Sequence, residues 1–206
     1  MIRLICIRHG QTDWNRTFRI QGQQDSNLDE LGIEQARLVG ERLKTMPDIK
    51  AIYASDLKRA FHTAEAIAKH HPHLTIQPDQ RLREAHFGDW ETRLWPNVMD
   101  EEEDRVNAWM RDVTAVTPPN GESMFQFTDR VREFLNETLP KHEEGTVLIV
   151  SHGGTVRAIV SVLMNFPLKT VWRLGTGNTS IAELKLDEYG VDLVRLNDTA
   201  HLGIEN

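Results

Sequence analysis

The stretch "LICIRHG" at residues 4–10 is a short apolar run that stops at an arginine and a histidine. Its four apolar residues are continuous rather than alternating, which is typical of a strand buried on both faces of a parallel sheet. The runs "KAIYAS" at 50–55 and "TVLIVS" at 146–151 have the same character. Three such strands favour an α/β domain with a mostly parallel central sheet.

Helical and hairpin patterns lie between and after these runs. Small or apolar residues recur at the i, i+3, i+4 spacing of a buried helix stripe within 29–44 and 56–70, and residues 155–164 are almost wholly apolar. The segments 180–186 and 191–196 alternate around a turn, as in a hairpin. We therefore predict a three-layer α/β/α sandwich with a mostly parallel central sheet and an antiparallel edge.

The region 87–123 does not follow this alternation of strands and helices. It holds an acidic run, the turn sequence "TPPNG" and three tryptophans, Trp90, Trp95 and Trp109. We predict a helical cap insertion at about 87–123 within one domain spanning 1–206. A solvated helix with an acidic face is the alternative. The tryptophans would form the wall of a site in the first case, and they would equally suit a core.

Composition limits the partners of the chain. With 24 basic and 31 acidic side chains among 206 residues, the net charge of −7 argues against binding to nucleic acid or to an anionic membrane surface. Any anionic ligand therefore needs a local basic cluster.

The compartment is indicated by two further features. The lone cysteine, Cys6, excludes an internal disulfide, and the apolar run at 4–7 is too short for a signal peptide or a membrane span, so we expect a cytoplasmic protein. The oligomeric state stays open, with a homodimer as one option.

Basic and polar residues follow each of the three strands. Arg8 and His9 end the first run, His152 follows the third, and Arg59 lies shortly after the second. Ligands of open α/β sheets bind beyond the carboxyl ends of the strands, so these side chains should meet at one edge. The planar guanidinium group of arginine can donate two parallel hydrogen bonds to phosphate oxygens. The glycine after each histidine lets backbone N–H groups approach the same anion. The pattern predicts a phosphoryl site.

Two histidines and one carboxyl group could supply the chemistry of phosphoryl transfer. An unprotonated imidazole can attack phosphorus, while a second imidazole stabilises charge. The departing oxygen needs a proton, and of Glu84, Asp89 and Glu91 we take Glu84 as the general acid. Each residue alone is more often structural, but their combination at strand ends favours a functional site. No Cys/His pairing of the zinc type is present, so we predict no metal and no cofactor.

The motifs now assembled resemble those of the histidine phosphatase superfamily, which has the phosphoglycerate mutase-like fold. The matching stretches are "RHGQTDWN" at 8–15, "GQQDSNLDELGIEQA" at 22–36, "YASDLKRAFHTAEAI" at 53–67, "LREAHFGDWE" at 82–91 and "SHGG" at 151–154. The resemblance thus covers nearly the whole chain.

The resemblance implies a role for each motif residue. His9 would be the phosphorylated nucleophile and Glu84 the proton donor, while Arg8, Arg59 and His152 would form the phosphate pocket.

Further residues are expected around the substrate. Asn15 matches a phosphate-contacting asparagine of the family, and Gln21 and Gly22 are expected near the bound group. We also place Gly153, which follows the second histidine, in contact with substrate.

Two positions depart from the family pattern. Gln11 stands where a glutamate is common, which removes a negative charge near the phosphate, and Thr92 stands where a glycine is common, which removes backbone freedom.

The C-terminal segments 178–190 and 197–202 are similar to bacterial phosphatases of the superfamily, including those that act on α-ribazole phosphate, and the glycolytic mutases are longer. We therefore expect a phosphomonoesterase acting on a small phosphorylated metabolite. A cofactor-dependent phosphoglycerate mutase and a non-catalytic phospho-ligand binding module are the alternatives.

Overall fold

The computed structural model describes residues 1–203 and is built on a six-stranded sheet in the order β3-β2-β4-β1-β5-β6. The strands are β1 (Ile2–Arg8), β2 (Ile49–Ala54), β3 (Ile76–Pro78), β4 (Gly145–Ser151), β5 (Ile181–Asp187) and β6 (Gly190–Asp198). The first four strands are parallel, whereas β5 pairs antiparallel with β1 and β6 antiparallel with β5. The predicted mostly parallel sheet with an antiparallel edge is confirmed.

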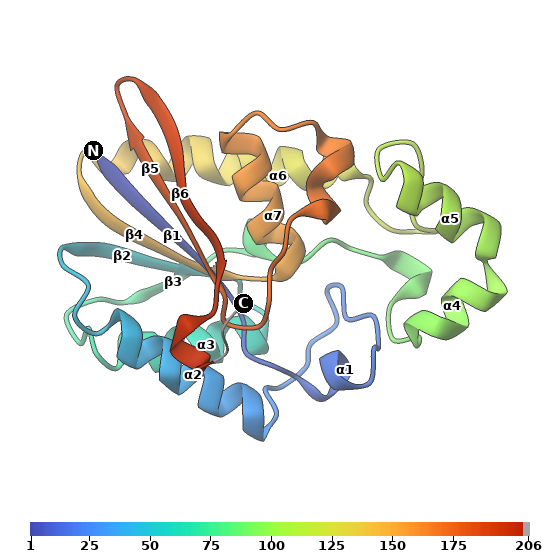
Figure 1. Cartoon of the computed structure of the whole chain (residues 1–206), viewed down its shortest axis with the longest axis horizontal. Coiled ribbons are helices and arrows are strands. Elements are labelled where there is room, and N and C mark those ends of the chain that lie inside the picture. The colour runs from blue at the N-terminus through green and yellow to red at the C-terminus, as the bar shows by residue number, and fades with distance from the viewer. Residues whose placement is uncertain (204–206) are drawn as a thin grey trace.

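Helices cover both faces of this sheet, with α2 and α3 on one face and α6 and α7 on the other (Figure 1). The α-helices are α1 (Asp13–Arg16), α2 (Glu30–Leu43), α3 (Lys58–Ala68), α4 (Trp95–Glu101), α5 (Glu103–Arg111), α6 (Met124–Thr138) and α7 (Gly153–Leu163). Short 3₁₀ helices are η1 (Gln80–Leu82), η2 (Gly88–Trp90), η3 (Leu139–Lys141), η4 (Leu168–Arg173) and η5 (Ala200–Leu202). Within residues 1–203, no helix has the length and apolar character needed to cross a membrane.

The packing of β1 explains its continuous apolar sequence. Leu4 and Cys6 belong to the core that α6 and α7 close, whereas Ile5 and Ile7 belong to the core under α2 and α3. Successive side chains of a strand point to opposite faces, so a strand between two helix layers must be apolar at every position. All four side chains are fully buried.

The sheet register brings the functional motifs to one edge. In the parallel pair of β1 and β4, Arg8 lies opposite Ser151, and in the pair of β2 and β4, Ala54 lies opposite Val150. The three strands therefore end together. The residues that follow them, including His9 and His152, begin at the same edge of the sheet.

A close contact fixes the first of these turns. Asp29 caps α2 by accepting a hydrogen bond from the backbone of Gly32 at 2.8 Å. A Cβ on Gly10 would lie 2.4 Å from the Gly32 carbonyl oxygen, and the start of α2 therefore packs directly on the turn after β1. Only glycine allows the backbone to approach so closely.

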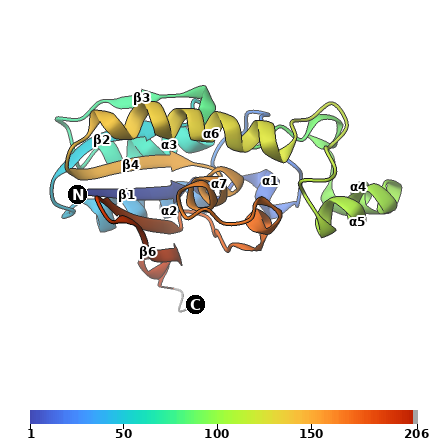
Figure 2. The ribbon, with the colours of Figure 1, turned by 90° about the horizontal axis from the view of Figure 1, so that it is seen from above.

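The segment between η2 and α6 carries α4 and α5, which both views place beyond the end of the strands (Figures 1 and 2). Trp90 is fully buried and donates its indole N–H to Glu102 at 3.2 Å. It packs with Val98 and Val106 in a small separate core. We predicted that residues 87–123 form a cap over the site within a single domain, and this stays a prediction.

Thr92 has a left-handed backbone conformation, with φ +69°. Its N–H donates to the carbonyl of Ile20 at 2.8 Å and its carbonyl accepts from the Arg19 guanidinium, so the neighbouring chain imposes this geometry. A β-branched residue is strained there, because its Cβ crowds the backbone. The family position that commonly holds glycine thus keeps the backbone shape of a glycine.

Replacing Thr92 by glycine should therefore stabilise the protein. Relief of the strain exceeds the entropy that glycine adds to the unfolded chain, for a net gain of about 1 kcal/mol, or roughly 2–4 °C in Tm. Thermal unfolding followed by circular dichroism measures the shift. Asn165→Gly is the matched control, because Asn165 (φ +54°) is exposed and asparagine tolerates this region. A lower Tm for Thr92→Gly would contradict the strain.

Candidate active site

A cavity of about 570 Å³ lies at the carboxyl ends of the strands. Seven of the predicted site residues line it, namely Arg8, His9, Asn15, Gln21, Gly22, Arg59 and Glu84. The other two lie directly beside them: the ring of His152 is 5.2 Å from that of His9, and a Cβ on Gly153 would lie 3.4 Å from Nε of Arg8. The structure thus brings all nine predicted residues together.

The His9 ring is held in one tautomer. Its Nδ1 lies 2.7 Å from the carbonyl oxygen of Gly10, which can only accept, so Nδ1 carries the hydrogen and Nε2 holds a lone pair. Burial, followed by the positive charges of Arg59 and Arg8, keeps the pKa of His9 well below its usual range. At neutral pH the ring is therefore a neutral imidazole with a free nucleophilic nitrogen.

Two arginines, fixed by backbone carbonyls, flank this ring. Arg8 donates to the carbonyl of Thr176 at 2.8 Å, and Arg59 donates to those of Gly22 and Gln24, both at 2.7 Å. Burial lowers the pKa of each guanidinium to about 10, so both remain charged at neutral pH. In both arginines the buried Nε–H has no hydrogen-bond partner among residues 1–203. Buried donors of this kind suit an anion.

His152 is fully buried beside His9, at the N-cap position of α7. Its Nε2 lies 2.8 Å from the hydroxyl of Ser55, which also accepts from the backbone of Leu57 at 3.3 Å. The other ring nitrogen, Nδ1, is buried without a partner in the part of the chain that the structure describes. Burial lowers the pKa of the His152 ring well below its usual range, and the positive charge of Arg59 adds to this effect. The ring is neutral and can offer Nδ1–H when Ser55 donates to Nε2.

Glu84 is held at the start of α7. One carboxylate oxygen accepts from the N–H of Gly154 at 2.9 Å, and the other accepts from the N–H of Ala85 at 2.9 Å. A Cβ on Gly154 would lie 2.2 Å from the carboxylate, so the helix start and the carboxylate pack closely only because this residue is glycine. These contacts fix Glu84 on the wall of the cavity.

Gly22 is held by a buried carboxylate that the sequence alone left unassigned. It has φ +52°, and a Cβ there would lie 1.9 Å from Glu91. The Glu91 carboxylate accepts hydrogen bonds from the backbone N–H groups of Gln23 and Phe87 at 2.9 and 3.0 Å. Glu91 therefore ties the Gly22 loop, whose carbonyls hold Arg59, to the chain after Glu84.

Asparagines order the other side of the cavity. Asn15 accepts from the Thr12 backbone at 3.1 Å as part of a capping box at α1. Asn178 donates to the carbonyl of His9 at 3.1 Å and to Asn15 at 3.4 Å. The sequence analysis missed Asn178, which lies far along the chain and reaches the site only because β5 pairs beside β1.

The outer wall of the cavity is mostly aromatic and contains residues that the sequence analysis did not predict. These are Phe18, Arg19, Ile20, Phe87 and Arg157, and they join Trp95 and Trp109. Of the three tryptophans considered above, Trp95 and Trp109 thus line the cavity and Trp90 belongs to the core. Arg157 carried a signal that was not used, because it is the lone charge in an apolar helix five residues after His152.

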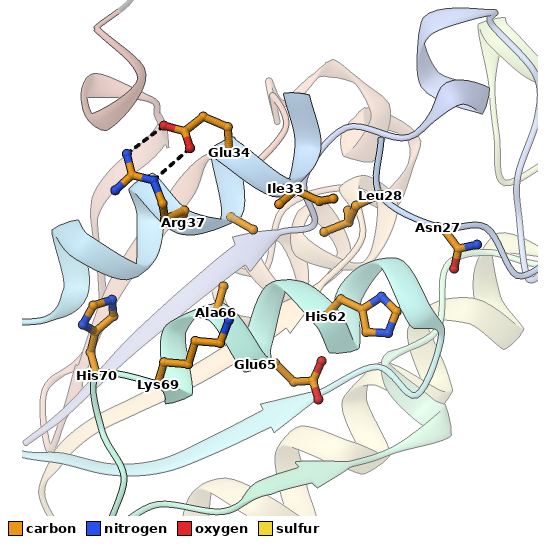
Figure 3. Close-up of a pocket in the computed structure, with 11 residues that line it drawn as sticks. Asn27, Leu28, Ile33, Glu34, Arg37, His62, Glu65, Ala66, Lys69 and His70 are labelled. Atoms are coloured by element: carbon orange, nitrogen blue, oxygen red, sulfur yellow. Dashed lines mark hydrogen bonds and ion pairs between the residues drawn. The ribbon is translucent and has the colours of Figure 1, made fainter. Parts of the chain in front are cut away.

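A larger hollow of about 860 Å³ lies between α2 and α3 (Figure 3). Ile33 lines one side, His62 and Lys69 the other, and a paired Glu34 and Arg37 lie near it. All nine predicted site residues are described, and the hollow contains none of them. Within residues 1–203, no three His, Cys, Asp or Glu side chains gather to hold a metal ion. The smaller cavity at the strand ends is the one with convergent polar groups.

Comparisons with known proteins agree with this geometry. The model of the histidine phosphatase superfamily (branch 1) matches residues 4–199. Phosphoserine phosphatase 1 of Hydrogenobacter thermophilus is 33% identical over 203 residues, covering 98% of this chain and 95% of the relative. A probable phosphoglycerate mutase of Proteus mirabilis is 37% identical over 188 residues, covering 89% and 85%.

A solved structure is also similar over the full length. The α-ribazole phosphatase from Shigella flexneri superposes with a TM-score of 0.86 at 30% identity, covering 99% of this chain and 100% of the other. The fold, the cavity and these relatives lead to one assignment. The chain belongs to the histidine phosphatase superfamily, branch 1, and is a phosphoric monoester hydrolase.

Proposed function

We propose that the chain hydrolyses small phosphorylated metabolites through a phosphohistidine formed on His9. The observation that supports this most directly is a set of unused buried polar atoms around one nucleophile. The Nε–H groups of Arg8 and Arg59 and Nδ1 of His152 have no partner among residues 1–203, and all three belong to side chains that neighbour His9, whose Nε2 is free. A phosphoryl group supplies the acceptor oxygens that these donors require.

In the first step, Nε2 of His9 attacks phosphorus while Arg8, Arg59 and His152 hold the equatorial oxygens. The N–P bond forms as the ester P–O bond breaks, and the bonding pair leaves with the alcohol oxygen. That oxygen takes the proton of Glu84, so a neutral alcohol departs. Because the arginines are fixed by backbone carbonyls before substrate arrives, little reorganisation is needed.

In the second step, water attacks the phosphohistidine. The Glu84 carboxylate accepts a proton from this water, the O–P bond forms, and the N–P bond breaks with its electron pair returning to Nε2. The Gly10 carbonyl keeps its hydrogen bond from Nδ1 throughout, so the ring need not turn between steps. Inorganic phosphate leaves, and Glu84 is again protonated for the next cycle.

Trapping of the intermediate tests this proposal. After mixing with ³²P-labelled p-nitrophenyl phosphate and quenching in alkaline detergent, the wild type should carry label that survives base and is lost in acid. His9→Ala should carry none. His62→Ala is the matched control, because His62 is exposed and lies outside the cavity, and it should label like the wild type. Label on His9→Ala would refute His9 as the nucleophile.

The mutase relative supports a second candidate function at the same site. A mutase must return the phosphoryl group to its substrate, whereas a phosphatase gives it to water. Incubation with 3-phosphoglycerate separates the two, because our proposal gives free phosphate and a mutase gives 2-phosphoglycerate. A non-catalytic binding module would bind the ligand stoichiometrically and release neither product.

A further inference from the structure

Arg157 is a charged side chain of the cavity that has no task in the reaction described above. It projects from α7, over the ring of Trp172 at 5.2 Å from its centroid. Its Nε donates to the carbonyl of Leu174 at 2.7 Å. Neither of its terminal nitrogens has an ion pair or a hydrogen bond with any of residues 1–203.

The surroundings of Arg157 make an unpaired charge costly. The side chain is half-buried, and burial lowers its pKa, an effect that the nearby charge of Glu84 partly offsets. The positive charge of Arg157 in turn lowers the pKa of Arg8. These interactions place Arg157 in the electrostatic environment of the reacting groups, and a half-buried guanidinium without an anion is unusual for a purely structural residue.

The three arginines of the cavity that act on the reacting groups carry one positive charge more than a phosphomonoester offsets. When Glu84 holds the proton that it donates, Arg8, Arg59 and Arg157 carry three positive charges, and a phosphomonoester dianion offsets two. Arg19, the fourth arginine of the wall, makes similar contacts, because it lies over the ring of Trp14 and bonds the Thr92 carbonyl. Unlike Arg157, however, it is not among the charges that shift the pKa of Arg8, His9 or Arg59. A substrate with one further negative charge would complete the balance.

Resting on the proposed function, we propose that Arg157 binds a carboxylate of the leaving group, and that the substrates are phosphomonoesters of small hydroxycarboxylic acids. Because Nε is engaged by Leu174, the guanidinium presents its two terminal nitrogens, which match the two oxygens of a carboxylate. Trp172 stacks near Trp109 and Phe87, with ring centroids at 5.7 and 6.1 Å. This aromatic wall keeps water away and strengthens the ion pair.

A purely structural role makes a different prediction. Arg157 also ties α7 to the chain after η4 through its bond to Leu174. If this were its only task, losing it would loosen the wall and impair all phosphomonoesters by a similar factor. Recognition of a carboxylate instead impairs only those substrates that carry one, so matched substrate pairs separate the two roles.

The test measures kcat/KM for two such pairs, O-phosphoserine against O-phosphoethanolamine and 3-phosphoglycerate against glycerol 3-phosphate. The wild type should prefer the carboxylate member of each pair by at least about 10-fold, the value of one charged, bidentate contact. Arg157→Met should lower kcat/KM for that member about 10- to 100-fold and abolish the preference. Arg157→Lys, which keeps the charge but not the fork, should fall between them.

Arg173→Met is the matched control, since Arg173 is an exposed arginine at the end of η4 and its loss should leave the preference intact. Equal losses on both members of a pair in Arg157→Met would overturn the proposal. So would a wild type that hydrolyses p-nitrophenyl phosphate but shows no carboxylate preference, or that prefers a second phosphate, as in propane-1,3-diyl bisphosphate against 3-hydroxypropyl phosphate. These outcomes would leave the proposed function unaffected. Detection of the phosphoryl label on His9→Ala, in contrast, would refute the proposed function.

Discussion

Replacing His9 by alanine should lower kcat for p-nitrophenyl phosphate by at least about 10⁴-fold, the scale seen when a covalent nucleophile is removed from its catalytic unit. The physical reason is that the other neutral imidazole at the site, His152, has its Nε2 engaged by the Ser55 hydroxyl and, with its hydrogen on Nδ1, has no free nitrogen with which to attack phosphorus. Arg8, Arg59 and His152 would still bind phosphate, so inhibition by inorganic phosphate should persist. Steady-state kinetics and phosphate inhibition measure the two effects separately.

A control guards against loss of fold in this experiment. His9 is almost fully buried, so alanine leaves a gap, whereas His9→Gln keeps most of the volume. Both variants should be inactive while melting cooperatively, as His62→Ala should with full activity. Activity within 10-fold of wild type in His9→Gln would remove His9 from the role of nucleophile.

Replacing Glu84 by glutamine should affect substrates according to their leaving groups. An alkyl phosphate needs a proton on the departing oxygen, so kcat should fall by about 10²- to 10⁴-fold. p-Nitrophenolate leaves readily without a proton, and formation of the phosphoenzyme from p-nitrophenyl phosphate should fall much less. Rapid-mixing measurement of p-nitrophenol release, compared with phosphate release from glycerol 3-phosphate, gives the contrast.

The design of this variant follows from the contacts of Glu84. The glutamine carbonyl can still accept from Gly154 or from Ala85, so the side chain keeps one of its two anchors. Glu65→Gln serves as the control, because Glu65 is exposed on α3 and outside the cavity. Equal losses for the two leaving groups would show that Glu84 positions substrate rather than donating a proton.

The tautomer and charge of His9 connect fold to mechanism. Burial disfavours the protonated form of the His9 ring, and so do the positive charges of the two neighbouring arginines. Both effects favour the neutral ring. The His9 ring therefore stays neutral below pH 6.5, where an exposed imidazole would be protonated, as the proposed role of nucleophile requires. The arrangement works because the sheet fixes His9 before any ligand binds.

Several features followed from sequence because they are local. The continuous run at 4–7 predicted a strand buried on both faces, and the three residue groups after the strands predicted a shared edge, since parallel strands end on the same side. Arg8, His9, Arg59 and His152 were found together for this reason, whereas Asn15, Gln21 and Gly22 were predicted from the resemblance to the family.

Only the tertiary structure decided the outer part of the site. Periodicity could not separate Trp90, which enters the core, from Trp95 and Trp109, which face the cavity, because that choice depends on how α4 and α5 pack. Asn178 and Arg157 reach the cavity through strand pairing and through the direction of α7, contacts between distant parts of the chain. Sequence thus determined which groups we propose for phosphoryl transfer, because they follow strands that end together, and packing decided which side chains form the outer wall of the cavity.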